Sequence, residues 1–238
     1  MLAFLHTAPV HVETFRRLAR ALDDAIPVRH EVHEGLLAAA LAAGTITDDV
    51  RSATASTVQA LADDGARVIV CTCSTLGGVA EAVPVSGCVV LRIDRPMAEQ
   101  AVASGRRIVV LAALESTFRP TVALLRQVAS DAERSIDVVE VLCERAWRRF
   151  EIGDHRGYAG EIARTIEATA RPGDLVLLAQ ASMAPAIELV RHLGIPVLSS
   201  PESGVAAALS RYRMETQHDA AQVGAAPGAT MGPLPSRR

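Results

Sequence analysis

Lysine is absent from this 238-residue sequence, so all 24 basic residues are arginine. Pyridoxal phosphate is held as a Schiff base on a lysine amine, and a chain without lysine therefore cannot be an enzyme of that class. Schiff-base aldolases and the lysine-dependent phosphate loop are excluded for the same reason. One missing residue type thus removes three mechanisms.

Long apolar runs and a basic stripe are also missing. The formal net charge is −3, and no cluster of arginines suited to phosphate contacts is present, so we expect no nucleic-acid partner. No window reaches eighteen uninterrupted apolar residues, so we expect no membrane association. The first residues lack the charged-then-apolar layout of a signal peptide, and a cytoplasmic protein is expected.

The four cysteines contain no C-x-x-C pair; they are Cys71, Cys73, Cys88 and Cys143. A reducing compartment disfavours structural disulfides, and Cys71 and Cys73 are too close along a strand to bridge without strain. A zinc site needs further ligands, and no histidine lies near either of these two thiols in the sequence. We therefore expect no disulfide and no metal.

The residues that are abundant predict an α/β fold. Half of the sequence is apolar and only 3% is aromatic, and runs of Val, Ile and Leu alternate with longer Ala-rich stretches of helical period. This alternation is typical of a parallel sheet with helices on both faces. Strands are expected at Leu2–His6, Val28–His33, Arg67–Thr72, Cys88–Ile93, Arg107–Ala112, Ile136–Leu142, Asp174–Ala179 and Pro196–Leu198.

An internal repeat divides these strands into two sets. At an offset of 107 residues, the segment from Arg67 to Gly78 aligns with the segment from Asp174 to Pro185, which places Cys73 on Gln180. At an offset of 106, the segment Leu2–Leu5 falls on Ile108–Leu111, and His11 falls on Thr117. The repeat predicts two pseudo-symmetric lobes, each a mostly parallel four-stranded sheet flanked by helices, with the active site in the cleft between them.

The domain limits follow from this division. We expect a first lobe over residues 1–95 and a second over residues 96–199, because Pro96 discourages a continuing strand. Residues 200–214 are expected to form a helix that returns to the first lobe, with Ser200 as N-cap before Pro201. Residues 215–238 are rich in Gly, Pro, Ala and Gln and are expected to be a flexible tail.

The carboxyl ends of the strands supply the candidate site, because open parallel sheets bind ligands there. Thr7, Ser74, Thr75 and Ser182 follow predicted strands, and helix-start N–H groups beside their hydroxyls can hold a carboxylate. For Thr7 and its neighbour His6, a local backbone-bonding role is the alternative to a role in the cleft.

Three segments resemble the aspartate/glutamate racemase superfamily, which includes hydantoin racemases, maleate isomerases and arylmalonate decarboxylases. Cys73-Ser-Thr75 is similar to the family's Cys-Asn-Thr motif. Leu178-Ala-Gln-Ala-Ser-Met183, which contains Ala181, is similar to its second motif, commonly Leu-Gly-Cys followed by small or polar residues. The segment Ala112–Thr117 resembles a threonine-containing segment that helps hold the substrate carboxylate, although Thr117 could instead cap a helix. The similarities span roughly residues 2–213.

The resemblance implies a reaction that needs no cofactor. In the family, one cysteine thiolate removes a proton from the carbon next to a carboxylate, and a second cysteine supplies a proton on the opposite face. Cys73 matches one of these cysteines, and we expect the helix start beside it to lower its pKa. Gln180 stands where the other cysteine would be and has no proton to exchange, but its amide can donate a hydrogen bond to an enolate-like oxygen.

Three functions remain open at this point. The first is a racemase-like isomerase that acts on a small amino acid or related acid, with His6, Thr7 or water serving the face opposite Cys73. The second is a one-cysteine decarboxylase of a malonate-type acid, although the arylmalonate decarboxylases carry their cysteine in the second motif, where this chain has Gln180. The third is an inactive small-carboxylate-binding protein, in which Cys73 is a buried, inert side chain. The sequence leaves the oligomeric state open, and a homo-oligomer is compatible with it.

Overall fold

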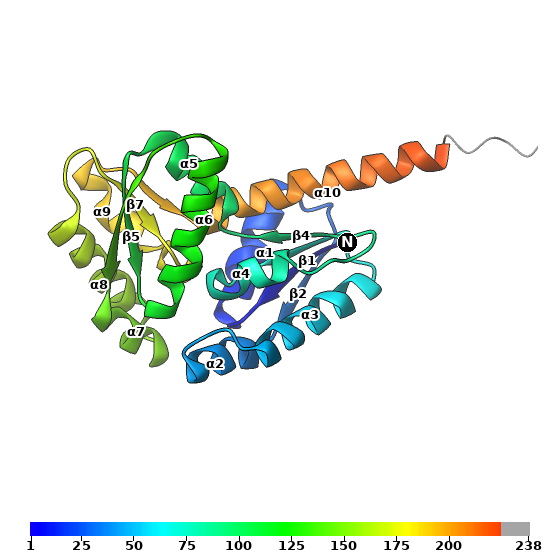
Figure 1. The fold of residues 1–238 in the computed structure, drawn as a ribbon, viewed down its shortest axis with the longest axis horizontal. Coiled ribbons are helices and arrows are strands. Elements are labelled where there is room, and N and C mark those ends of the chain that lie inside the picture. Colours follow the sequence, from blue (N-terminus) through cyan, green and yellow to red (C-terminus); the bar gives the residue numbers. More distant parts are fainter. Residues whose placement is uncertain (225–238) are drawn as a thin grey trace, which may run out of the picture.

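The computed structural model describes the backbone of residues 1–224 and the side chains of residues 1–218. Two parallel four-stranded sheets form two lobes that lie side by side (Figure 1). The first sheet contains β1 (Leu2–His6), β2 (Val28–Val32), β3 (Val68–Cys71) and β4 (Val89–Arg92). The second sheet contains β5 (Arg107–Ala112), β6 (Asp137–Leu142), β7 (Leu175–Leu178) and β8 (Val197–Ser199). The predicted fold class is confirmed, and every strand lies where it was predicted, to within two residues at each end.

The helices occupy the intervals between the strands. The helices that begin in residues 1–95 are α1 (Val10–Leu22), α2 (Glu34–Ala43), α3 (Asp48–Asp63), α4 (Ser74–Glu81) and α5 (Arg95–Ser104). Those of the second half are η1 (Glu115–Thr117), α6 (Phe118–Asp131), α7 (Glu144–Glu151), α8 (His155–Thr169), η2 (Ala181–Met183), α9 (Ala186–Val190), η3 (Arg191–Leu193) and α10 (Ser200–Gly224).

The two sheets repeat each other strand by strand. Their strand orders, β2-β1-β3-β4 and β6-β5-β7-β8, are equivalent. The pairing register is also equivalent, because Leu2 lies opposite Val68 in the first sheet and Ile108 lies opposite Leu175 in the second. These pairs are related by the offsets of 106 and 107 residues seen in the sequence, so the repeat extends to the backbone hydrogen bonds.

Both faces of each sheet are buried. The first sheet packs against α1 and α10 on one face and against α2, α3 and α4 on the other. The second sheet packs against α5 and α6 on one face and against α7, α8 and α9 on the other. Burial on both faces explains why the central strands β3, β5 and β7 are mainly runs of apolar residues, whereas the edge strands β2 and β6 also contain charged residues.

The last helix of each half crosses to the other half. Helix α5 follows β4 but buries Met97 and Val102 against the second sheet. Helix α10 follows β8 and buries Val205 and Leu209 against the first sheet. Figure 1 shows this long helix running along the first lobe. The two lobes therefore share their cores through a reciprocal exchange of helices.

Helix α10 corrects two predictions. It runs to Gly224 and so includes ten residues that were predicted to belong to a flexible tail; the remaining residues of that prediction lie outside the described residues. Ser200 is the first residue of the helix, and its buried hydroxyl has no hydrogen-bond partner among the described residues, so it does not act as the predicted cap.

A buried ion pair lies where the two lobes meet. Arg92, at the end of β4, donates from Nε to Asp94 Oδ1 at 2.6 Å and from Nη2 to Asp94 Oδ2 at 2.9 Å. The two side chains are only 6% and 1% exposed. Arg92 Nη2 also lies 3.5 Å from the carbonyl oxygen of Pro120 in α6. Arg92 of the first lobe thus contacts the second lobe. Its buried charge is balanced by Asp94, two residues further along the chain.

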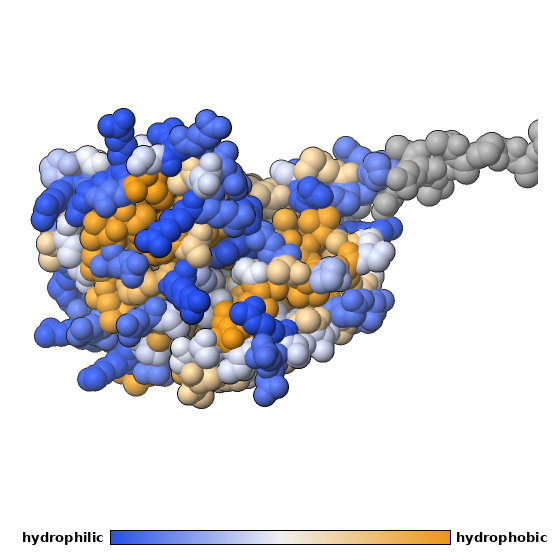
Figure 2. Space-filling view, viewed as in Figure 1, coloured by the Kyte–Doolittle hydropathy of each residue, from blue (hydrophilic) through white to orange (hydrophobic). Residues whose placement is uncertain are grey.

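The surface in Figure 2 mixes hydrophilic side chains with smaller apolar patches on both lobes. The large apolar side chains that are exposed are spread over several elements, for example Leu22 in α1, Leu189 in α9 and Met214 in α10. Within the described part of the chain, no helix is long and apolar enough to cross a membrane. A homo-oligomer remains a prediction.

Candidate functional site

All eight residues predicted to form the site line one small cavity at the carboxyl ends of the strands. The cavity has a volume of about 50 Å³ and lies between the lobes. The predicted residues that line it are Thr7, Cys73, Ser74, Thr75, Thr117, Gln180, Ala181 and Ser182. Cys73 and Gln180, which occupy equivalent positions in the repeat, therefore lie on the wall of the same cavity.

Cys73 is the residue that joins β3 to α4. It occupies the N-cap position of α4, but its sulfur makes no capping hydrogen bond. Burial raises the pKa of the Cys73 thiol, and this effect outweighs the lowering by the Thr7 hydroxyl and by the backbone amides of Thr75 and Leu76. The prediction that the helix start would lower this pKa is wrong in its net direction, because desolvation of a thiolate is the larger effect. The thiol is protonated at neutral pH.

Gln180 holds the equivalent position after β7. Its side-chain Oε1 accepts a hydrogen bond of 2.6 Å from the backbone N–H of Ala113. Because the oxygen is engaged in this bond, the amide NH₂ is the part of Gln180 that remains to donate to a ligand. Ala113 is the repeat equivalent of Thr7, whose hydroxyl interacts with Cys73. The two lobes thus share an arrangement. The residue after β1 (Thr7) interacts with the side chain that follows β3 (Cys73), and the residue after β5 (Ala113) with the side chain that follows β7 (Gln180).

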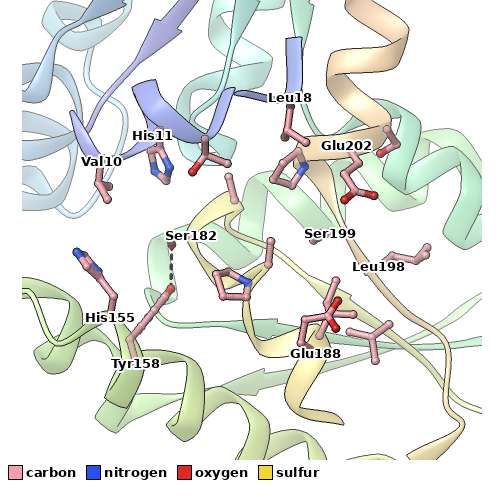
Figure 3. A pocket seen from close by; sticks show the side chains of 18 of the residues that line it. Val10, His11, Leu18, His155, Tyr158, Ser182, Glu188, Leu198, Ser199 and Glu202 are labelled. Carbon is pink, nitrogen blue, oxygen red and sulfur yellow. Dashed lines mark hydrogen bonds between the residues drawn. The ribbon is translucent and has the colours of Figure 1, made fainter. Parts of the chain in front are cut away.

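Two hydroxyl groups at the cavity have defined partners. Ser74 Oγ donates to the carbonyl oxygen of Ala179 at 2.5 Å, which is a bond from the first lobe to the second. Ser182 Oγ and the hydroxyl of buried Tyr158 lie 2.9 Å apart, and Figure 3 shows this contact as a dashed line. The first bond joins the start of α4 to the residue that follows β7, and the second fixes Ser182 to α8 within the second lobe.

Thr75 and Thr117 are nearly inaccessible to solvent on the cavity wall. Thr117 makes no side-chain capping hydrogen bond to α6, so the alternative capping role is not observed. Its hydroxyl therefore has no role in starting this helix. A role in holding a carboxylate stays a prediction.

His6 is excluded from the cavity by its own hydrogen bonds. Its Nδ1 lies 2.9 Å from Thr72 Oγ1, and its Nε2 lies 2.9 Å from His30 Nδ1. The ring is fully buried and stacks on Phe4 and on His30, with ring centroids 6.1 Å and 5.2 Å away. With both nitrogens engaged, His6 is not placed to serve the face opposite Cys73.

This buried histidine should make stability depend on pH. Burial, followed by the neighbouring His30 and His11, lowers the pKa of His6 to about 3. Between pH 6.5 and that value the unfolded chain binds a proton that the folded chain does not, so the free energy of unfolding falls as pH falls, by about 1.4 kcal/mol per pH unit. Urea denaturation at several pH values should show a shallower acid decline in His6→Gln than in the native chain. The exposed control His192→Gln should follow the native slope, and parallel curves for all three proteins would contradict the assignment.

Among the further residues that line the cavity are three side chains with rings that were not predicted as site residues: His11 from α1, and Trp147 and Phe150 from α7. Burial lowers the pKa of His11 to about 4, so it is a neutral donor or acceptor at pH 7. One signal for His11 was present in the sequence, because His11 aligns with Thr117 in the repeat. No comparable signal marked the two aromatic residues.

The described lining of the cavity contains no arginine, aspartate or glutamate. A carboxylate in it would be held by hydroxyl groups and by the N–H groups at the start of α4 and η2. Among the described residues there is also no group of three or more His, Cys, Asp or Glu side chains that could hold a metal ion. The site offers one thiol, neutral hydrogen-bond donors and apolar surface.

The architecture matches a group of solved structures. Aspartate racemase from Picrophilus torridus superposes with a TM-score of 0.67 at 19% identity, over 88% of this chain and 92% of that one. Glutamate racemase from Francisella tularensis gives a TM-score of 0.62 at 12% identity, over 92% and 81% of the two chains. This chain has the racemase fold. Arylmalonate decarboxylase has the same fold and matches with a TM-score of 0.56 at 18% identity, over 88% and 91% of the two chains.

At the level of fold, the match confirms the resemblance predicted from the three motifs. No family model and no curated protein matches this sequence. The racemase fold places the two cavity-lining positions after β3 and β7, and the chemistry there depends on which residues this chain carries at them.

Proposed function

We propose that this protein is a cofactor-independent isomerase or racemase-like enzyme that transfers a proton at the carbon next to the carboxylate of a small amino acid or related acid. The observation that carries the proposal is the shared cavity, which Cys73 and Gln180 both line from equivalent positions of the two lobes. Cys73 is the acid/base group. Gln180 donates its amide N–H to the oxygen that gains negative charge when the carbon loses its proton.

The substrate carboxylate is assigned to the helix starts after β3 and β7. Ser74, Thr75, Ala181 and Ser182 supply backbone N–H groups or hydroxyls there, and Thr7 and Thr117 add hydroxyls. Since Gln180 cannot exchange a proton, the face opposite Cys73 must be served by water or by neutral His11, which lines the same cavity. His6 takes no part, because both of its nitrogens are engaged.

A decarboxylase of a malonate-type acid is the second candidate, and the raised pKa of Cys73 favours it. Decarboxylation leaves a carbanion-like intermediate that needs a proton donor, and a thiol that is protonated at neutral pH is such a donor. The racemase-like reaction instead begins with a thiolate. A third candidate is a carboxylate-binding protein without turnover, for which the replacement of the second cysteine by Gln180 is the argument.

Solvent exchange separates the three candidates. The native protein is incubated in D₂O with a panel of amino, hydroxy and dicarboxylic acids, and deuterium at the α-carbon is followed by NMR. In parallel, 2-substituted malonates are assayed for CO₂ release. Deuterium uptake without loss of a carboxylate supports the isomerase, and CO₂ release with one solvent deuteron in the product supports the decarboxylase. Tight binding of a panel member with neither reaction would leave only the binding protein.

The pH dependence of the rate should report the direction of proton transfer. If the Cys73 thiolate abstracts the proton, the exchange rate should rise about tenfold per pH unit and level off only above the ordinary thiol value of about 8.5, because burial raises this pKa. If the thiol donates the proton, the rate should stay constant until the pH reaches the raised pKa of Cys73 and should fall above it. Rates measured between pH 6 and pH 10 distinguish the two, and a base-type profile that levels off near pH 7 would rule out a thiol with a raised pKa.

A further inference from the structure

A second, much larger cavity adjoins the small one. It has a volume of about 650 Å³ and lies between the lobes, where α1 and the start of α10 face α8, η2, α9 and β8. Figure 3 shows this arrangement, with Val10, His11 and Leu18 on one side and His155 and Tyr158 on the other. The two cavities have four lining residues in common, namely His11, Phe150, Ala181 and Ser182.

The small cavity is much the smaller of the two. Its volume is about 50 Å³, against about 650 Å³ for its neighbour, so it suits a carboxylate and an α-carbon rather than a substrate with a bulky side chain. The larger cavity falls within the range of roughly 300–1,000 Å³ that is usual for small-molecule sites. If the reacting carbon sits beside Cys73, the rest of the molecule must extend past Phe150 and His11 into the larger cavity.

The charges around the two cavities restrict what that molecule can carry. The described lining of the small cavity has no acidic side chain to pair with an ammonium group and no arginine to pair with a second carboxylate. Four charged residues line the larger cavity, but Arg191 pairs with Glu188 at 2.6 Å, and Arg17 and Glu202 are exposed and of opposite sign. An ammonium group or a second carboxylate in the small cavity would lose hydration without gaining an ionic partner among the described residues.

Aromatic side chains are few in this chain, and several of them lie together beside the two cavities. Trp147 and Phe150 stack with ring centroids 5.0 Å apart, and Phe150 contacts Tyr158 and His155 at 5.2 Å and 5.7 Å. Phe150 lines both cavities, Trp147 lines the small one, and His155 and Tyr158 line the larger one. The sequence has only seven Phe, Trp and Tyr residues in total, so three of the seven lie here.

The rest of the larger cavity is mainly apolar with neutral polar groups. Leu18, Pro185, Ile187 and Leu198 provide apolar surface. Ser203 also lines it, and the buried hydroxyl of this residue has no hydrogen-bond partner among the described residues.

We infer that the two cavities form one binding site for a monocarboxylate with an uncharged α-substituent and a bulky apolar side chain, aromatic in preference to short aliphatic. The inference rests on the proposed function for the placement of the carboxylate and the reacting carbon. The carboxylate and α-carbon occupy the small cavity, and the side chain passes Phe150 and lies in the larger one. Free amino acids and dicarboxylates are poor ligands, because their second charge has no ionic partner in the described lining of the small cavity and meets only solvent-exposed charged side chains in the larger one.

Binding of a matched ligand series tests this directly. Isothermal titration calorimetry on the full chain compares N-acetyl-L-phenylalanine with three other acids. N-acetyl-L-alanine has a small side chain, N-acetyl-L-aspartate has a small charged side chain, and L-phenylalanine has a charged α-amino group. We expect N-acetyl-L-phenylalanine to bind at least tenfold more tightly than each of the other three. Equal affinities, or tighter binding of the aspartate derivative, would overturn the inference.

A cavity-filling variant locates the side chain. Ala184 lines only the larger cavity, so Ala184→Phe should weaken N-acetyl-L-phenylalanine at least tenfold and leave N-acetyl-L-alanine within twofold of native. Ala168→Phe places the same ring on the exposed face of α8, away from both cavities, and should bind both ligands as the native chain does. Thermal unfolding of both variants identifies any loss of folding. If the folded Ala184→Phe protein retains native affinity for N-acetyl-L-phenylalanine, the side chain does not occupy this cavity.

The two proposals fail in different ways. Calorimetry needs no turnover, so preferential binding of N-acetyl-L-phenylalanine without exchange or CO₂ release supports the binding site and refutes the proposed function. Deuterium exchange on aspartate that is as efficient as on the apolar acid supports the proposed function and refutes the ligand class.

Discussion

Replacement of Cys73 by alanine is expected to lower the rate of α-carbon exchange by about 10²- to 10⁴-fold, the range for loss of a positioned acid or base. The reason is geometric, because Cys73 is the one group with an exchangeable thiol proton in the described lining of the small cavity. The free energy of unfolding should change by only about 1 kcal/mol, since a small buried side chain is replaced by another. Deuterium uptake and urea denaturation measure the two effects separately.

Cys71 provides a matched control two residues away. It is a buried thiol in β3 that packs in the core of the first lobe and does not line the cavity. Cys71→Ala should therefore change stability by a similar amount and leave the exchange rate within about twofold of native. Exchange that persists in Cys73→Ala, or that is lost equally in both variants, would show that Cys73 does not transfer the proton.

Replacement of Asp94 by alanine should destabilise the fold more than any other single change discussed. Removing one partner of a buried ion pair leaves the other as an uncompensated buried charge, at a cost of about 3–5 kcal/mol. Asp94 is 1% exposed and its partner Arg92 is held between α4 and the carbonyl oxygen of Pro120. Urea denaturation of Asp94→Ala should show this loss in the midpoint, with little change in slope.

Two further variants test whether the loss of stability comes from burial of the unpaired charge. Glu81→Ala removes the partner of Arg95 from a pair whose side chains are 28% and 24% exposed, and it should cost about 1 kcal/mol or less. The double variant Arg92→Met with Asp94→Leu removes both charges and should recover most of the stability that Asp94→Ala loses. If Asp94→Ala costs no more than Glu81→Ala, Arg92 must reach water or another acceptor when its partner is gone.

The fold was readable from the sequence because parallel strands buried on both faces leave an unambiguous pattern. The repeat added the equivalence of Cys73 and Gln180, and the register of the two sheets shows why it was detectable: equivalent residues make equivalent backbone pairs. Positions fixed by backbone topology can be predicted in this way.

Other features depend on side-chain packing, and the sequence did not reveal them. The net direction of the Cys73 pKa depends on how completely the sulfur is desolvated, which no local motif records. Trp147 and Phe150 reach the cavity because of how α7 packs on the second sheet, and their spacing alone is equally typical of a core-facing helix.

Helix α10 is longer than the predicted helix over residues 200–214, and the reason lies in the composition of the residues that follow. Glu215, Gln217 and the alanines that follow favour a helix, and the predicted tail averaged them with the Gly- and Pro-rich residues beyond Gly224. Glycine is a usual residue at a helix end, and Gly224 is the last residue of α10.

The hydrogen bond from Ser74 Oγ to the carbonyl oxygen of Ala179 ties together the residue after Cys73 and the residue before Gln180. A separation of the lobes that is wide enough to admit a ligand to the small cavity must stretch or break this bond. Such a separation would move apart the strand ends that carry Cys73 and Gln180, and the two ends would come together again when the bond re-forms. Under the proposed function, ligand entry and proton transfer would therefore require different positions of the lobes.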